Sequence, residues 1–394
     1  MDRTQIGWRH RRWFREECRL GVDGRLFAPA LHPAPTVTCQ QEGQFDIWRG
    51  NVRKAVLDSV DEFVAERCAV DLRGAGVDVA ADVLIGFVGS GKCLRSTFMF
   101  LGWLCGAEPS HAALRAAASL ELLHAFALLQ DDVMDGSPLR RGRASAHVQF
   151  ANWHRGRGLT GCPQRFGESA AVLLGDLCLV WAEQMLRDSG VSHDSLSRTW
   201  SRYDAMRSEL AVGQFADLVN DVGGLPTLDE VLEVARRKSG NYTVRRPLEI
   251  GAAMAGCGER VLSSLGHYGD AVGEAFQLRD DLLGIFGSPA VTGKPVGADL
   301  AEHKATSVVV AAHHMADPVL RSQLAELMSA TDLDEADIQR WRALIAATGA
   351  EQRIEEMITD RLRRATECVD DERFDAAVRS ALLNMATVCT QRAA

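Results

Sequence analysis

Three aspartates end an apolar stretch in the first half of the chain, ELLHAFALLQDDVMD. Asp131 and Asp135 are four residues apart, so a helix would place both carboxylates on one face, with Asp132 beside the first. Carboxylates crowded at the end of an apolar helix repel one another and require a counter-charge. Because no Cys or His stands within DDVMD, its oxygen ligands favour Mg²⁺ over Zn²⁺. The motif predicts a magnesium site; the alternative is a solvated helix end whose acids pair with the arginines that follow.

A second pair of acids, Asp280 and Asp281, interrupts another apolar helical stretch, AFQLRDDLLGIFG. Two acid clusters on two helices can face each other across a bundle and hold metal between them. Arg140 and Arg141 follow the first cluster, and their permanently charged guanidinium groups suit phosphate oxygens. Together these residues indicate metal-assisted chemistry on a phosphorylated substrate.

The two acid motifs resemble those of the trans-polyprenyl diphosphate synthases, in which aspartate-rich segments clamp magnesium around an allylic diphosphate. DDVMD matches the first motif and DDLLG the second, and the resemblance covers roughly residues 50–394. It implies an all-α fold, a single large helical bundle of the isoprenoid synthase type around a central apolar cavity. The metal ligands and catalytic acids that it implies, for three Mg²⁺ ions, are Asp131, Asp132, Asp135, Asp280 and Asp281.

The implied reaction is a prenyl transfer of isoprenoid biosynthesis. Magnesium and basic side chains would neutralise the diphosphate leaving group, so that the allylic C–O bond ionises and the double bond of isopentenyl diphosphate attacks the carbocation. The implied partners are isopentenyl diphosphate and dimethylallyl, geranyl or farnesyl diphosphate. Gly284 departs from the family, whose second motif ends in aspartate at that position. We therefore expect the metal shell on that side to rest on Asp280 and Asp281.

A basic segment, GSGKCLRS, precedes the first acid motif. The full phosphate-loop spacing GxxxxGK[ST] fails because Cys93 follows Lys92, so a nucleotide-binding loop is not indicated. Lys92 and Arg95 would share a face at the start of a helix, where cations and free backbone N–H groups can bind an anion; two solvated surface charges are the alternative. The resemblance assigns Lys92 and Arg95 to isopentenyl diphosphate together with His124 and Arg141, and Arg140 to the allylic diphosphate.

Polar residues of the second half complete the expected allylic site. GQFADL carries Gln214 and Asp217 one turn apart, a spacing that also suits a simple surface pair. The family has a similar GQxxD, then a Lys-Thr/Ser-x-x-Tyr-Thr segment whose lysine and hydroxyl hold the allylic diphosphate, then a mobile segment with two lysines. Lysines suit that role as mobile point charges. The matching residues are Lys238, which is also assigned to catalysis, Ser239, Tyr242, Gln277, Lys294, Lys304 and, without an assigned role, Asp299.

Composition limits the other possibilities. The 394 residues are 46% hydrophobic and 25% charged, which suits a large globular core, and the net charge of −9 argues against a nucleic-acid partner. The ten cysteines contain no CxxC pair, so neither a zinc ribbon nor a disulfide framework is indicated. No apolar run reaches the roughly eighteen residues of a membrane span. We therefore expect a soluble, cytoplasmic protein without a membrane span.

Two regions differ in character. Residues 1–45 are rich in arginine and then broken by prolines, and we expect a loosely ordered N-terminal extension. In residues 46–394, apolar residues recur at three- and four-residue spacing without strand-like alternation, which predicts one all-helical domain. Several segments are apolar nearly all round, which is typical of buried helices. Because members of the family pair along buried helices, we also expect a homodimer.

The product length is expected to depend on residues one or two turns before Asp131. In the family, bulk at positions corresponding to Phe126 and Ala127 forms the floor of the product tunnel. One aromatic beside a small residue resembles the synthases that stop at geranylgeranyl diphosphate, with farnesyl diphosphate as the second possibility. The alternative is that Phe126 packs in the core and another helix forms the floor.

Two other functions stay open. A class I terpene cyclase also ionises an allylic diphosphate between acid motifs in a helical fold, but it does not need the isopentenyl site of Lys92, Arg95 and His124. A non-catalytic subunit of a heteromeric prenyl synthase would bind without turnover, but it does not need the intact DDVMD. The prenyl diphosphate synthase is the favoured function.

Overall fold

The computed structural model describes residues 34–36, 43–72, 76–222, 224–288, 296–330 and 332–391. The chain divides into two units, Met1–Ala34 and Pro35–Ala394. The first unit lies outside the described residues except for Ala34, so the predicted extension over residues 1–45 is almost wholly outside them. Lys294 also lies outside them.

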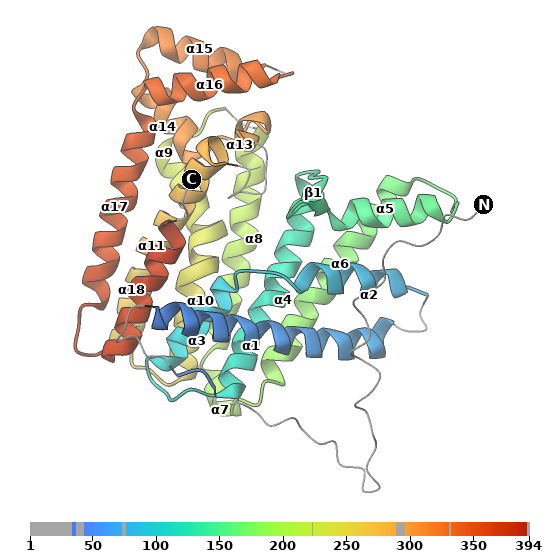
Figure 1. The fold of residues 1–394 in the computed structure, drawn as a ribbon, viewed down its shortest axis with the longest axis vertical. Helices are drawn as coiled ribbons and strands as arrows, with labels where there is room; N and C mark the ends of the chain where they lie inside the picture. Colours follow the sequence, from blue (N-terminus) through green and yellow to red (C-terminus); the bar gives the residue numbers. More distant parts are fainter. Residues whose placement is uncertain are drawn as a thin grey trace, which may run out of the picture. The chain divides into compact units, whose positions relative to one another are not determined.

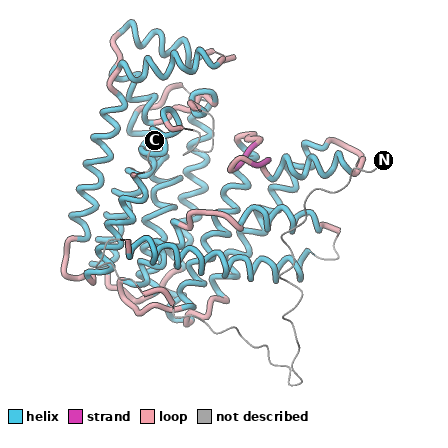
Figure 2. Tube along the Cα trace, viewed as in Figure 1, coloured by secondary structure: helices cyan, strands magenta, loops and turns pink. Residues whose placement is uncertain are grey.

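The second unit is built from helices (Figures 1 and 2). Within the described ranges the β-structure is one antiparallel hairpin, β1 (Leu139–Arg140) paired with β2 (Arg143–Ala144). The prediction of an all-α fold is confirmed. In chain order the helices are α1 (Gln44–Arg67), η1 (Cys68–Leu72), α2 (Asp78–Val88), α3 (Leu94–Leu104), α4 (His111–Met134), α5 (Ala146–Gly156), α6 (Pro163–Arg187), α7 (His193–Ser197), α8 (Trp200–Val222), α9 (Leu228–Ala235), η2 (Arg236–Arg245), α10 (Arg246–Met254), α11 (Glu259–Phe286), α13 (Ala298–Ala301), α14 (Ser307–Met315), α15 (Pro318–Ser329), α16 (Glu335–Ala347), α17 (Ala350–Val369) and α18 (Ala376–Thr390).

Two long helices carry the acid motifs. Asp131 and Asp132 lie in the last turn of α4, with Asp135 at its C-cap, and Asp280 and Asp281 lie near the C-terminal end of α11. Helix α4 packs against α6 and α3, and α11 packs against α17 and the π-helix η2 (Figure 1). Because η2 also packs against α8, it joins α8 to α11.

An apolar core fixes the second acid helix. Residues of α11, α14, α16 and α17 form a cluster in which Trp341 is 1% exposed and Ile345 and Ile354 are fully buried. Burial of apolar area on this scale is the main force that holds helices together. Near the site, the Thr306 side chain accepts a hydrogen bond from Val309 N and so caps the start of α14.

Two helices bear on the expectation that the chain has no membrane span. By length and apolar composition, α4 and α6 meet the criteria for a membrane span. In α4, however, 61% of the most apolar window is buried inside the fold, and in α6 the share is 44%. Helices that pack against several others fit a protein core equally well. Apolar composition alone therefore does not separate core helices from membrane spans here.

Candidate active site

Arg140, on strand β1 of the hairpin that follows α4, is a counter-charge for the first acid motif. The Asp132 side chain is 1% exposed, and Arg140 Nε donates to its Oδ1 at 2.8 Å. Arg140 Nη2 bonds the same oxygen and also approaches Asp131 Oδ2 at 3.4 Å. Burial raises the pKa of Asp132 although Arg140 acts in the opposite direction. The pairing with a following arginine, which belonged to the alternative interpretation of this motif, is therefore present, although Asp132 is buried rather than solvated.

Two lysines connect this motif to other elements. Lys238 Nζ on η2 lies 2.5 Å from Asp217 Oδ2 on α8 and 3.4 Å from Asp131 Oδ1 on α4. Lys304 Nζ lies 3.6 Å from Asp135 Oδ2 and 2.8 Å from Glu302. Burial lowers the pKa of Lys238, but Asp131 and Asp217 more than offset it, so the pKa is raised. Both lysines are held as cations between carboxylates.

Small residues allow η2 to reach this position. A Cβ on Gly273 of α11 would lie 2.6 Å from Gly240 Cα of η2, and a Cβ on Gly213 of α8 would lie 2.7 Å from Lys238 N. Real Cβ atoms do not approach so closely, so any larger residue would push η2 away. The glycines thereby allow the backbone at Lys238 to lie close enough for its side chain to reach Asp217 and Asp131. A π-helical turn at such a place is typical of functional sites.

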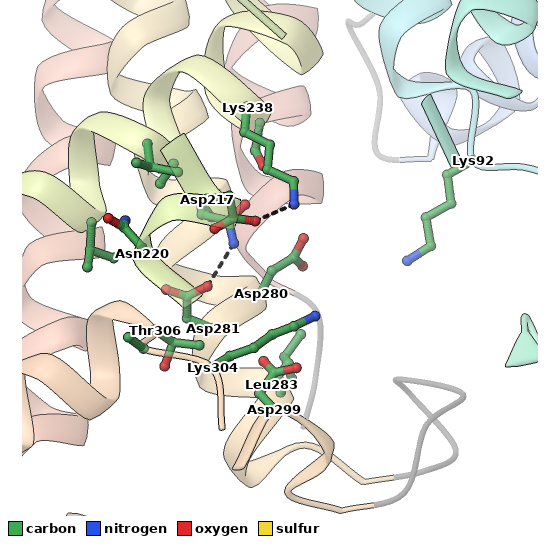
Figure 3. Close-up of a pocket in the computed structure, with 17 residues that line it drawn as sticks. Lys92, Asp217, Asn220, Lys238, Asp280, Asp281, Leu283, Asp299, Lys304 and Thr306 are labelled. Atoms are coloured by element: carbon green, nitrogen blue, oxygen red, sulfur yellow. Dashed lines mark hydrogen bonds and ion pairs between the residues drawn. The ribbon is translucent and has the colours of Figure 1, made fainter. Parts of the chain in front are cut away.

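The two acids of the second motif have different surroundings. Asp281 is 6% exposed; its Oδ1 accepts from Gln277 Nε2 at 2.7 Å, and its Oδ2 accepts from Ser307 N at 3.0 Å and Ser307 Oγ at 2.6 Å. Burial raises the pKa of Asp281 to about 6. Asp281 therefore ties α11 to the first residue of α14. Both acids line a cavity, and Figure 3 shows the Asp280 carboxylate on the cavity side.

This cavity has a volume of about 410 Å³. Figure 3 shows Lys92 extending toward it from the opposite wall to Asp280 and Lys304. Most of the residues that line this cavity are polar or charged, as a site for a charged ligand requires. The polar and charged residues that line it are Lys92, Asp217, Asn220, Lys238, Ser239, Gln277, Asp280, Asp281, Asp299, Lys304 and Thr306, and the larger apolar ones are Val231, Val234 and Leu283.

A second polar cluster lies between α3, α4 and η2. The Arg95 guanidinium carbon stands 4.3 Å from the centre of the Tyr242 ring, and the rings of Tyr242 and His124 are 6.3 Å apart. Burial, and then Arg95, lower the pKa of His124, so its imidazole is neutral near pH 7. Arg95 Nε and His124 Nδ1 are buried without a hydrogen-bond partner in the described part of the chain. The predicted neighbours Arg95 and His124 thus meet, and Tyr242 joins them rather than Lys238.

The loop before α3 is fastened by other arginines. Arg141 Nη1 donates to Ser90 Oγ at 3.0 Å and also to Ser90 O, and Arg53 Nε donates to Gly91 O at 2.6 Å. The structure therefore brings Arg141 to the Lys92 segment, as predicted. Cys93 and Arg141 have φ angles of 49° and 52°, a strained region for residues other than glycine. Such strain is typical of sites that other contacts hold in place.

The other predicted residues are Gln214 on α8 and the expected product-length residues Phe126 and Ala127 on α4. Gln214 on α8 has a buried Nε2 without a hydrogen-bond partner in the described residues. Phe126 and Ala127 are partly accessible on α4, whereas Ala125 before them and Leu129 after them are buried. Ser307 was not predicted; the run KATSVVVAA, a hydroxyl pair before an apolar helix, is the signal that could have indicated it.

The residues fit a divalent cation, although the arrangement is not a preformed metal cluster. Among the described residues no group of three or more His, Cys, Asp or Glu is close enough to hold a metal ion. The reason is visible in the ion pairs, because Arg140, Lys238 and Lys304 stand at the carboxylates. Yet Asp132 Oδ2 is buried and receives no hydrogen bond from any described group, and the buried Asp131 Oδ1 has only the Lys238 ammonium group at 3.4 Å among the ion pairs of the described residues. Buried oxygen acceptors of this kind suit a hard cation.

Comparison with known proteins agrees with this geometry. The family model described as "Polyprenyl synthetase" matches residues 79–345. The geranylgeranyl diphosphate synthase of Mycobacterium tuberculosis is 32% identical over 284 residues, which are 72% of this chain and 75% of the relative. The geranylfarnesyl diphosphate synthase of Aeropyrum pernix is 32% identical over 66% of this chain and 77% of its own. A crystal structure of geranylgeranyl pyrophosphate synthase from Corynebacterium glutamicum, complexed with isoprenyl diphosphate and magnesium, superposes with a TM-score of 0.82 at 35% identity, covering 87% of this chain and 99% of that one.

An all-α bundle with acid motifs on two helices around a lysine-lined cavity defines a transferase for phosphorylated substrates. The chain belongs to the polyprenyl synthetase family. It is a prenyl-transferring enzyme, as its sequence predicted.

Arg140→Met should destabilise the protein without ligand, because it leaves the buried Asp132 carboxylate uncompensated. Losing one partner of a buried ion pair costs about 3–5 kcal/mol. Urea unfolding should show that loss for Arg140→Met, and most of it should return when Asp132→Asn is added. Arg143→Met, in the same hairpin but exposed, should change little. Equal stability of the two arginine variants would contradict the assignment of Arg140 as the counter-charge.

Proposed function

We propose that this enzyme condenses isopentenyl diphosphate with an allylic diphosphate and releases geranylgeranyl diphosphate. The observation that supports this most directly is the pair of bridging lysines. Lys238 and Lys304 line the cavity of the second acid motif and at the same time contact Asp131 and Asp135 of the first. One cavity thus combines carboxylates for metal with cations for phosphate, which is what an ionising diphosphate requires.

Charge explains why metal would accompany the substrate. The cavity wall carries the acids Asp217, Asp280, Asp281 and Asp299 and the lysines Lys92, Lys238 and Lys304. These charges nearly cancel, so a diphosphate would enter with its own negative charge uncompensated. Mg²⁺, held by Asp131, Asp135 and Asp280, would supply Lewis-acid neutralisation of the diphosphate leaving group. A count of three ions follows from the family resemblance.

The chain's own residues would then act in defined ways. Lys238 and Lys304, once their carboxylates have metal partners, can turn their ammonium groups to the allylic diphosphate oxygens. Lys92 and Arg95 would hold isopentenyl diphosphate, and His124, being neutral, would donate a hydrogen bond rather than a charge. The allylic C1–O bond breaks, the double bond of isopentenyl diphosphate forms the new C–C bond, and the departing diphosphate takes the proton released from C2.

The cyclase alternative is less well supported. A cyclase needs a single diphosphate site, whereas here Arg95 and His124 form a second polar cluster with unpartnered buried nitrogens in the described part of the structure. Unsatisfied buried donors and acceptors are costly and suit a site that a ligand completes. The second cluster therefore favours the two-substrate reaction.

The activity test uses purified protein, isopentenyl diphosphate, Mg²⁺ and each of the dimethylallyl, geranyl and farnesyl diphosphates. Asp131→Asn and Asp135→Asn should each lower the condensation rate by about 10²–10³-fold or more. Each removes a carboxylate that would hold the Mg²⁺ needed to neutralise the leaving group. Asp58→Asn, an exposed change on α1, serves as the control. Near wild-type turnover of either motif variant at saturating Mg²⁺ would refute the metal assignment.

Product length would be set on α4. Phe126 stands five residues before Asp131, and both it and Ala127 are partly accessible, so they can face a product chain. Phe126→Ala should therefore lengthen the products beyond those of the wild type, while Phe126→Tyr, which keeps the bulk, should not. Chromatography of the dephosphorylated products measures this. An active Phe126→Ala enzyme with unchanged products would show that another helix forms the floor.

A homodimer would cover apolar residues that the described chain leaves exposed. On α8, Val212, Phe215 and Val219 are 49%, 73% and 63% exposed at helical spacing, and on α6, Leu173 and Val180 are 65% and 62% exposed. Apolar helix faces of this kind are typical of subunit contacts. Light scattering should give a dimer mass for the wild type and a monomer mass for Phe215→Glu. Val319→Glu, equally exposed on α15, should leave the mass unchanged; a wild-type monomer would refute the proposal.

A further inference from the structure

Gly284 ends the second acid motif, and the space that a side chain would need there is occupied by another residue. A Cβ on Gly284 would lie 2.5 Å from Asp299 Cγ and closer still to Asp299 Oδ2. The Asp299 carboxylate thus occupies the volume that any side chain at position 284 would need. Sequence alone suggested only that an acid is missing here. The structure shows an acid in its place, contributed by α13 instead of α11.

A further carboxylate is needed at the cavity because the two acids of α11, Asp280 and Asp281, have different surroundings. Both oxygens of Asp281 already accept hydrogen bonds, from Gln277 and Ser307, and the side chain is nearly buried. Asp280, Asp281 and Asp299 all line the cavity, but Asp281 is the one whose Oδ2 is held by the first residue of α14. In Figure 3 the Lys304 side chain runs between Asp280 and Asp299.

The backbone holds Asp299 in this position. Asp299 O accepts a hydrogen bond from Lys304 N at 2.9 Å, so the turn after α13 links Asp299 directly to the cavity lysine. Gly297, with a φ of 71°, begins α13, and a Cβ there would lie 2.6 Å from Ile338 Cγ2 of α16. Gly297 therefore allows the start of α13 to pack closely against α16, two residues before Asp299.

We propose that Asp299 supplies the carboxylate that the second acid motif lacks: Asp280 and Asp299 together bind the divalent cation on this side of the cavity, and Gly284 is required because Asp299 occupies its side-chain space. The proposal rests on the metal assignment made above. It replaces the expectation that Asp280 and Asp281 form this part of the shell, and it makes Asp281 a positioning residue that holds α14.

The relation between Gly284 and Asp299 is reciprocal, which gives a specific test. Asp299→Ala removes the carboxylate. Gly284→Ala adds only a methyl group, but this methyl must displace Asp299. The double variant Gly284→Asp with Asp299→Ala returns a carboxylate to nearly the same space from α11. Gly86→Ala, at an exposed helical glycine whose Cβ would meet nothing within 4 Å, is the matched control for a glycine change.

The measurement is Mn²⁺ binding in the presence of methylenediphosphonate, an inert diphosphate analogue, followed by the electron paramagnetic resonance signal of free Mn²⁺. Asp299→Ala and Gly284→Ala should each weaken binding by about 10-fold or more, the usual range for removing a group that supports a metal site. The double variant should recover most of the lost affinity, and Gly86→Ala should equal the wild type. Circular dichroism melting confirms that each variant is folded.

The outcomes separate the two claims. If the wild type binds no Mn²⁺ with the analogue, the metal assignment and this inference both fail. If the wild type binds Mn²⁺ but Asp299→Ala binds it equally well, the metal assignment stands and Asp299 is not a ligand. If the double variant binds no better than Asp299→Ala alone, the carboxylate cannot be supplied from position 284, and the proposed exchange is wrong.

Discussion

The structure depends on how carboxylates gathered at the ends of apolar helices are neutralised. Burial raises the pKa of Asp135, and the negative charge of Asp131 raises it further. Lys238, Lys304 and Arg140 supply the opposing charges from three different elements. Because each cation comes from another part of the chain, the ion pairs also fix how η2, the turn after α13 and the β-hairpin sit against α4.

Close helix packing makes these distances possible. A lysine reaches a carboxylate on a neighbouring helix only when the two backbones are near, and Gly213, Gly240 and Gly273 allow that approach for η2. The same principle operates at Gly284, where the absent side chain admits a carboxylate from α13. Small residues in this protein are therefore part of the site, since they determine which charged groups can meet.

The sequence predicted what depends on spacing along one helix. The acid motifs and the all-α fold follow from periodicity and from the family resemblance, whereas only the resemblance assigned Arg95 and His124, on two different helices, to one substrate. What it could not predict depends on contacts between helices. The two hydrogen bonds that Ser307, at the start of α14, donates to Asp281 could not be read from DDLLG. Tyr242 follows Lys238 by one turn, but the wider π-helical turn directs it to Arg95 instead.

The type of cation at each acid indicates how the site can change on binding. Arg140 contacts Asp132, the most buried acid of the first motif, through a planar fork that holds its geometry. Arg140 also approaches Asp131, but lysines, whose ammonium groups move on flexible stems, stand at both Asp131 and Asp135. On the proposed function, a metal ion bound by those two carboxylates would release mobile cations where a diphosphate needs them, while Arg140 would keep the buried acid compensated. The same side chains can thus stabilise the protein before binding and the leaving group afterwards, with only the lysines changing partners.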